Sequence, residues 1–157
     1  NQIGLVYGGG TRGLMGALAR SVHENGGEIT GVIPEFLQTK ERPFADPNDV
    51  VITRDMHERK RIMFERADAF VALPGGIGTL EELVEQLTWA QLGQHEKPIL
   101  MANIANFWKP LLVLLAHMRE FHFIRQELEV KYLVSENVAD ILPMLEQAAA
   151  LKLHRRA

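Results

Sequence analysis

The chain has 157 residues, with 17 lysines and arginines against 20 aspartates and glutamates, which gives a formal net charge of −3. This length predicts one domain, and the charge argues against nonspecific binding to nucleic acid or to an anionic membrane surface. Cysteine is absent, which excludes disulfides and thiolate chemistry, and the longest strongly apolar run, 111–116, is much shorter than the roughly 20 residues of a membrane helix.

Apolar runs typical of buried strands alternate with segments of helical periodicity along the whole chain. We expect strands over 3–7, 29–33, 50–53, 69–73, 98–101 and 130–134. Helices are predicted over 14–24, 56–67, 80–92, 107–120 and 138–151, and a polar surface loop over 38–48. Crossovers of this length join parallel neighbours, so the sequence predicts an α/β fold: a doubly wound, Rossmann-like parallel sheet with helices on both faces in a single domain.

Two glycine-rich loops each follow a predicted strand and precede a predicted helix. The first is GGGTRGLMG, from Gly8 to Gly16, and the second is PGGIGT, from Pro74 to Thr79. Unpaired N–H groups at such a junction favour an anion, and glycine lets the anion approach the main chain. Tight packing of a strand against a helix also selects glycine, so one loop alone is a weak signal. Two loops favour a ligand site. The Walker A lysine is missing, and the first loop lacks the downstream acid that would bind a dinucleotide ribose, so a mononucleotide phosphate fits better.

Two adjacent glutamates follow the second loop. The spacing of Thr79 and Glu82 matches a capping box, in which the Glu82 side chain bonds back to the N–H of Thr79. This structural role is the simpler interpretation of the spacing. A carboxylate beside an anion site can also act as a general base or stabilise a developing cation, so both interpretations stay open.

The predicted helix 56–67 begins with the sequence MHERKR. Its helical spacing places Met56, Arg59, Lys60 and Met63 on one face, which is partly apolar and partly cationic. Such a face could hold a planar base on methionine and a phosphate or ribose on arginine. The alternative is a helix at the rim whose long basic side chains lie over the core. No histidine pair has the spacing of a metal site.

In combination, these motifs resemble the LOG family of cytokinin riboside 5'-monophosphate phosphoribohydrolases, also described as lysine decarboxylase-like proteins. The stretches that carry the resemblance are Gly8-Gly9-Gly10, MHERK at 56–60, PGGIGTLEE at 74–82 and TWAQLG at 88–93. The resemblance covers nearly the whole chain. Family members begin with a further strand, a Gly-Ser loop and a helix ahead of Ile3, so we expect 1–157 to be a LOG-like nucleotide-binding domain without that segment.

The resemblance implies hydrolysis of the N-glycosidic bond of adenosine 5'-monophosphate, plain or N6-modified, to a free base and ribose 5-phosphate. It implies catalytic roles for Arg59 and Glu82. The residues expected to bind the substrate are Met56, Lys60, Gly75, Gly76, Gly78, Thr79, Gly9 and Gly10. It also implies that neither a metal nor an organic cofactor is needed, and that the protein is a cytoplasmic homodimer. Independently of the resemblance, the helix predicted over 80–92 carries more apolar residues than one face packed against a sheet can bury, which favours an interface between the helices of two subunits.

Two other functions compete with this interpretation. A non-catalytic nucleotide-binding or molybdenum-cofactor carrier protein of the same fold would share the glycine loops, but it would not need both Arg59 and Glu82. A pyridoxal-phosphate-dependent lysine decarboxylase has little support, because the chain is short for that chemistry and no lysine stands out as a Schiff-base candidate. The arginine and the glutamate together favour the hydrolase.

Overall fold

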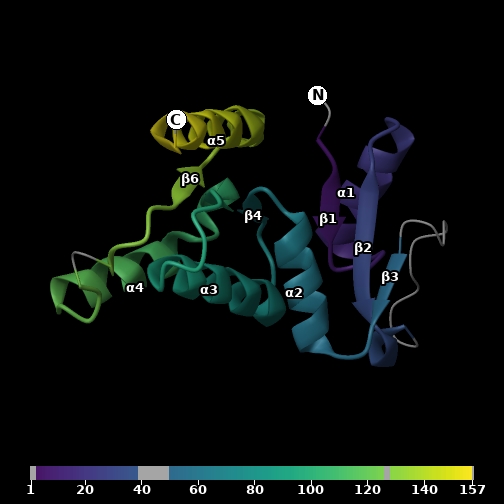
Figure 1. The fold of residues 1–157 in the computed structure, drawn as a ribbon, viewed down its shortest axis with the longest axis horizontal. Helices are drawn as coiled ribbons and strands as arrows, with labels where there is room; N and C mark the ends of the chain where they lie inside the picture. The colour runs from purple at the N-terminus through teal and green to yellow at the C-terminus, as the bar shows by residue number, and fades with distance from the viewer. Residues whose placement is uncertain (1–2, 39–49, 126–127, 157) are drawn as a thin grey trace. The chain divides into compact units, whose positions relative to one another are not determined.

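The computed structural model describes residues 3–38, 50–125 and 128–156, with side chains up to 151 (Figure 1). Its residues form two compact units, 1–67 and 68–157. Each unit contains a three-stranded parallel sheet. Among the described residues no helix is long and apolar enough to cross a membrane. The predicted surface loop over 38–48 lies, except for its first residue, outside the described part of the chain.

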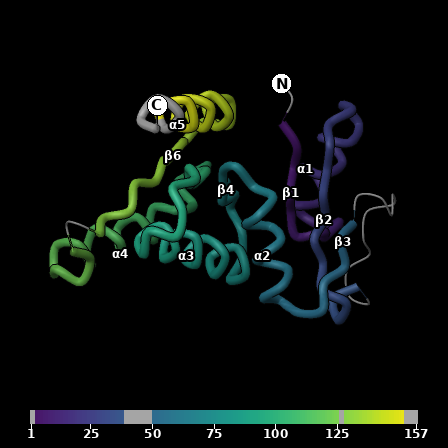
Figure 2. The backbone as a smooth tube through the Cα atoms, in the orientation of Figure 1, coloured from purple at the N-terminus to yellow at the C-terminus, as the bar shows by residue number. Residues whose placement is uncertain are grey.

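The first unit is built on three parallel strands in the order β1-β2-β3, which Figure 2 traces from purple to blue. Its elements are β1 (Leu5–Tyr7), α1 (Gly13–Glu24), β2 (Ile29–Pro34), a 3-10 turn η1 (Glu35–Leu37), β3 (Val50–Thr53) and α2 (Met56–Arg66). Tyr7 pairs with Gly31, and Pro34 pairs with Thr53. Helix α1 contacts β1 and β2, and α2 contacts all three strands.

Helix α2 has a well-defined start. The side chain of Asp55 accepts a hydrogen bond from the N–H of Glu58 at 2.8 Å and so caps the helix. The Glu58 carboxylate in turn accepts hydrogen bonds from the main chain and the guanidinium of Arg54. These bonds hold the pKa of Glu58 below its ordinary value. The acidic residue next to Arg59 is therefore engaged in fixing the end of the helix.

The second unit carries strands β4-β5-β6 in that order. Its elements are β4 (Phe70–Ala72), α3 (Ile77–Gln91), β5 (Ile99–Ala102), η3 (Ile104–Asn106), α4 (Lys109–Glu120), β6 (Leu133–Ser135), η5 (Val138–Asp140) and α5 (Ile141–Arg156). All pairings are parallel, with Ala72 opposite Met101 and Ala102 opposite Ser135.

The middle strand of this sheet, β5, is buried on both faces. Ile99 and Met101 pack with residues of α3 and α4 in one apolar cluster. Leu100 and Ala102 pack with residues of α5 in a second cluster. Within this unit, Figure 1 shows α5 on one side of the strands and α3 with α4 on the other. Alternate side chains of one strand thus supply two cores, as expected for a strand covered by helices on both faces.

The parallel α/β class predicted from the sequence is confirmed. Most elements begin and end within two residues of their expected positions, and 50–53 matches in full. Three starts differ by three residues. Helix α3 begins earlier than expected, at Ile77, and the last strand starts at Leu133 instead of 130. A 3-10 turn occupies 138–140, so α5 begins only at Ile141. That the two units make one domain stays a prediction.

Candidate functional site

The first glycine loop leaves β1 at its carboxyl end and passes close over β2. Gly9 has a φ of +79°, a conformation that favours glycine, and a Cβ there would stand 3.1 Å from Ile33 Cβ. Gly31 faces it from β2, where a Cβ would come 3.1 Å from Gly9 Cα. Gly9 and Gly10 are both buried. Tight packing therefore explains Gly9, and the structure gives the glycine at this position a structural role.

Arg59 lies in α2 and is almost fully buried, with 9% of its surface exposed. Its Nε donates a hydrogen bond of 3.0 Å to the carbonyl of Val32, in the middle of β2. Its Nη2 lies so close to Gly8 that a Cβ at Gly8 would overlap it. The guanidinium is therefore held at the end of β1, beside the first glycine loop. A buried charge held this precisely is unusual in a solvated rim helix.

The rest of α2 agrees with the face predicted from the spacing. Met56 and Lys60 are half-buried on the side of Arg59, whereas His57 and Arg61 are exposed. Sequence reasoning missed Gly8 as a site residue, although its lack of a side chain is what admits the guanidinium of Arg59. The glycine triplet was the available signal. The Val32 carbonyl carries no sequence signal, because every residue has one.

The second glycine loop ends in the first turn of α3, and this corrects the expected role of Thr79. The cap of the helix is Gly76, with extended backbone and no side-chain hydrogen bond, and Thr79 is the third helical residue. Thr79 is therefore not an N-cap, and the capping box of Thr79 with Glu82 is wrong. Sequence spacing suggested it because the glycines mask the true start of the helix. Glu82 is half-buried in the next turn and Glu81 is exposed.

The glycines of this loop differ in what surrounds them. A Cβ at Gly75 would overlap Oγ1 of Thr79, so that glycine is needed for local packing. Among the described residues, nothing stands within 4 Å of a Cβ at Gly76 or at Gly78, and neither has a positive φ. Packing does not explain these two glycines. That a ligand approaches the main chain here, at the start of the helix, stays a prediction.

We expect Gly78→Ala to weaken nucleotide binding without harming the fold. Alanine in place of a helical glycine stabilises a helix by about 0.5–1 kcal/mol, whereas the added methyl obstructs an anion at the main chain. The KM for adenosine monophosphate, the substrate that the family resemblance implies, should rise at least about tenfold, while the melting temperature stays equal or rises. Gly4→Ala is the matched control, since its Cβ would make only ordinary contacts, the nearest at 3.7 Å. An unchanged KM in Gly78→Ala would remove this glycine from the site.

The structure thus places Arg59 with the first loop in one unit, and Glu82 with the second loop in the other. Each half is defined by its own contacts. That the two halves serve one ligand stays a prediction.

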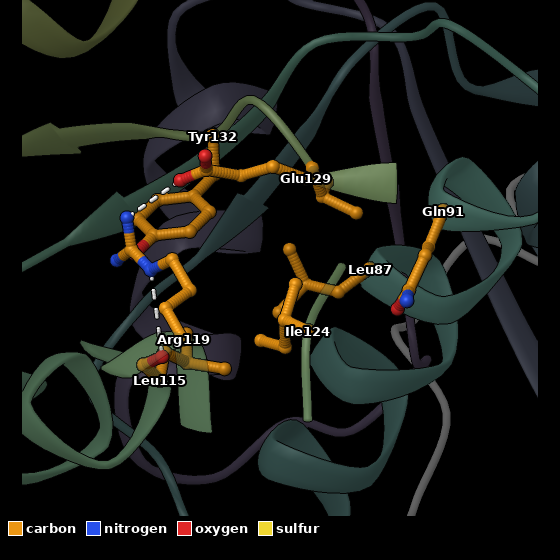
Figure 3. Close-up of a pocket in the computed structure, with 8 residues that line it drawn as sticks. Leu87, Gln91, Leu115, Arg119, Ile124, Glu129 and Tyr132 are labelled. Atoms are coloured by element: carbon orange, nitrogen blue, oxygen red, sulfur yellow. Dashed lines mark hydrogen bonds and ion pairs between the residues drawn. The ribbon is translucent and has the colours of Figure 1, made fainter. Parts of the chain in front are cut away.

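A small hollow in the second unit is lined by none of the residues of that unit's glycine loop (Figure 3). It measures about 50 Å³ and is lined mainly by apolar side chains, among them Leu87 near the end of α3, together with Gln91, Arg119 and Glu129. At its edge Arg119 pairs with Glu129 at 2.6 Å and donates to the hydroxyl of Tyr132 at 3.1 Å. Ligand pockets are usually several hundred Å³, so this hollow is a packing gap and not a nucleotide site.

His95 has a structural role. The Nδ1 of His95 accepts from the N–H of Lys97, so its Nε2 carries the proton and donates to the carbonyl of Gln86 at 3.2 Å. Its ring also meets Phe70 edge-on. Within the described ranges, no cluster of three or more histidine, aspartate or glutamate side chains is placed to hold a metal ion.

Comparison with known proteins shows which protein family the chain resembles. Residues 15–145 match a family model described as "possible lysine decarboxylase". The chain is 42% identical over 149 residues to the probable cytokinin riboside 5'-monophosphate phosphoribohydrolase LOG4 of Oryza sativa, covering 95% of this chain and 65% of that protein. It is 41% identical over 145 residues to cytokinin riboside 5'-monophosphate phosphoribohydrolase LOG5 of Arabidopsis thaliana, covering 92% and 64%. The chain therefore spans about two thirds of the length of these relatives.

Proposed function

The chain belongs to the LOG family, and on this basis we propose that it hydrolyses the N-glycosidic bond of a purine nucleoside 5'-monophosphate. The substrate would be adenosine 5'-monophosphate or an N6-modified derivative, and the products a free base and ribose 5-phosphate. The observation that carries the proposal is the second loop, where a Cβ at Gly76 or Gly78 would meet none of the described residues and Glu82 follows in the next turn of a helix whose N-cap is Gly76.

The glycine loop at the start of α3 is suited to the 5'-phosphate. The first-turn N–H groups of a helix have no intrahelical partner, and the helix dipole favours negative charge at that end. Gly75 lets the Thr79 side chain fold back against the loop, where its hydroxyl is a further donor. Phosphate bound here would fix the ribose near the next turn of the helix.

Glu82 is suited to the bond cleavage. Breaking an N-glycosidic bond builds positive charge on the sugar ring, in an oxocarbenium-like state, and a carboxylate stabilises that charge or takes a proton from the attacking water. The water oxygen then bonds to C1 of the ribose as the bond from C1 to the base breaks. The electron pair of that bond leaves with the base, which gains a proton.

Arg59 supplies a fixed cation for the substrate. Its Nε is bonded to the Val32 carbonyl and its Nη2 lies beside Gly8, so the guanidinium is fixed at the first glycine loop. A charge held in place before the substrate binds costs little reorganisation in the reaction. Met56 and Lys60, half-buried on the same face of α2, would border the base and the ribose phosphate.

The experiment that tests the function is incubation of the full chain with adenosine monophosphate and with its isopentenyl derivative, followed by chromatography for free base. The proposal expects base from at least one of them. A non-catalytic nucleotide or molybdenum-cofactor carrier would bind ligand and release none. A pyridoxal-phosphate enzyme would be yellow as purified and would release carbon dioxide from lysine.

We also propose that the protein acts as a homodimer through the outer side of α3. Leu83 and Leu87 of this helix lie in the core, yet Val84 is 43% exposed and Leu92 is 66% exposed. Apolar side chains that the core does not bury are suited to a symmetric interface between helices of two subunits.

Val84→Asp should therefore yield monomers with reduced activity, because a charge at the centre of an apolar interface is costly. Light scattering across the micromolar range, with activity followed in parallel, measures both. Glu81→Asp, at an exposed acidic position of the same helix, controls for surface substitution. Wild-type protein that is monomeric and fully active would contradict the interface.

A further inference from the structure

The end of strand β4 is held by a buried tryptophan from the start of α4. Trp108 is 4% exposed, and its indole N–H donates a hydrogen bond of 3.1 Å to the carbonyl of Ala72. Ala72 is the last residue of β4, and the second glycine loop, Pro74 to Thr79, begins two residues later. The acceptor is therefore the carbonyl at the end of the strand, two residues ahead of the loop.

The tryptophan is itself fixed from the neighbouring strands. Its main-chain N–H donates to Oδ1 of Asn103 at 2.8 Å, and Asn103 is 3% exposed. The N–H of Asn103 donates to the carbonyl of Ser135 at 2.7 Å. Asn103 directly follows β5, and Ser135 ends β6. One chain of hydrogen bonds thus ties together the carboxyl ends of β4, β5 and β6.

A core tryptophan needs some acceptor for its N–H, and any buried carbonyl would satisfy it. The important property of this hydrogen bond is that its acceptor lies close to the second glycine loop. Ala72 is only three residues from Gly75, and Gly76 caps α3. A displacement of about 1 Å at a site that orients substrate can cost roughly a hundredfold in rate. The position of the loop is thus sensitive to the bond at Ala72.

We propose that Trp108 is a positioning residue for the second glycine loop, setting where that loop presents its N–H groups to a substrate phosphate. The inference rests on the proposed function for the identity of the ligand. It assigns to a side chain outside both glycine motifs an influence on recognition of the 5'-phosphate. Asn103 acts in the same way through Trp108.

The test is Trp108→Phe in the full chain, which keeps an aromatic ring and loses the indole N–H. We expect the KM for adenosine monophosphate to rise about tenfold, the effect of losing one well-placed hydrogen bond. The preference for the 5'-monophosphate over the corresponding riboside should fall, with kcat at saturating substrate changed much less. Asn103→Ala should give the same pattern, and it replaces Trp108→Phe if that variant does not fold.

Leu145→Ala is the control, because it opens the core on the other face of β5 without touching Ala72 or Trp108. Its KM and its preference for the phosphate should stay as in the wild type. An equal change in Leu145→Ala and Trp108→Phe, or no change in Trp108→Phe, would overturn the inference. Calorimetric binding of adenosine monophosphate keeps the two proposals apart: wild-type protein that binds the nucleotide without cleaving it refutes hydrolysis, while weaker binding by Trp108→Phe still supports the positioning role.

Discussion

Glu82→Gln is expected to lower release of the base by about 10²- to 10⁴-fold, the usual contribution of a general base, while leaving the fold intact. Glutamine has the same shape and retains hydrogen bonding, but it neither accepts a proton from water nor carries the charge that stabilises a sugar cation. The N-cap of α3 is Gly76, and the substitution leaves that residue unchanged.

The matched control for this prediction is Glu81→Gln, one residue earlier and exposed. It makes the same chemical change on the same helix and should keep near wild-type activity. The kcat and the melting temperature of both variants are to be measured. Glu82→Gln with wild-type kcat would leave the carboxylate without a part in the reaction.

Arg59→Ala is expected to lose activity more severely than Lys60→Ala. Arginine offers a planar guanidinium that the Val32 carbonyl holds in one orientation, whereas Lys60 is a half-buried ammonium one position further along the helix. Removing the guanidinium also takes a donor from a buried carbonyl, so about 1–3 kcal/mol of stability should be lost.

Arg59→Lys separates the two effects in that prediction. Lysine keeps the charge and much of the volume, so most of the lost stability should return. It lacks the planar guanidinium that the Val32 carbonyl orients, so kcat should stay low. Activity and denaturant unfolding, measured on all three variants, decide the matter. Equal effects of Arg59→Ala and Lys60→Ala, confined to KM, would instead indicate a diffuse phosphate-binding surface.

Local sequence pattern predicted the alternation of strands and helices because the two periodicities are set by burial on one or two faces. It failed at the start of α3, where glycines without side chains carry no periodic signal, and Ile77 is 82% exposed. The glycine loops could be predicted to form an anion site, and that role stays a prediction. Which of their glycines packing requires could not, because it depends on neighbours such as Thr79 and Arg59 in three dimensions.

The contacts that fix the site were beyond the sequence for the same reason. Arg59 bonds to a carbonyl 27 residues away, and the Trp108 indole bonds to one 36 residues away. Neither carbonyl is marked by a side chain. Trp108 lies in the core, and nothing in the sequence pattern predicts its bond to the end of β4.

The most direct test of the central claim is the stoichiometry of products from adenosine monophosphate in a buffer without inorganic phosphate. Free adenine and ribose 5-phosphate are to be quantified together over several turnovers, with Glu82→Gln alongside. Our account predicts equal amounts of the two products from the wild type and neither from the variant, with nucleotide still bound. Tight binding of the nucleotide by the wild type, with no base released, would contradict it and favour a carrier protein of the same fold.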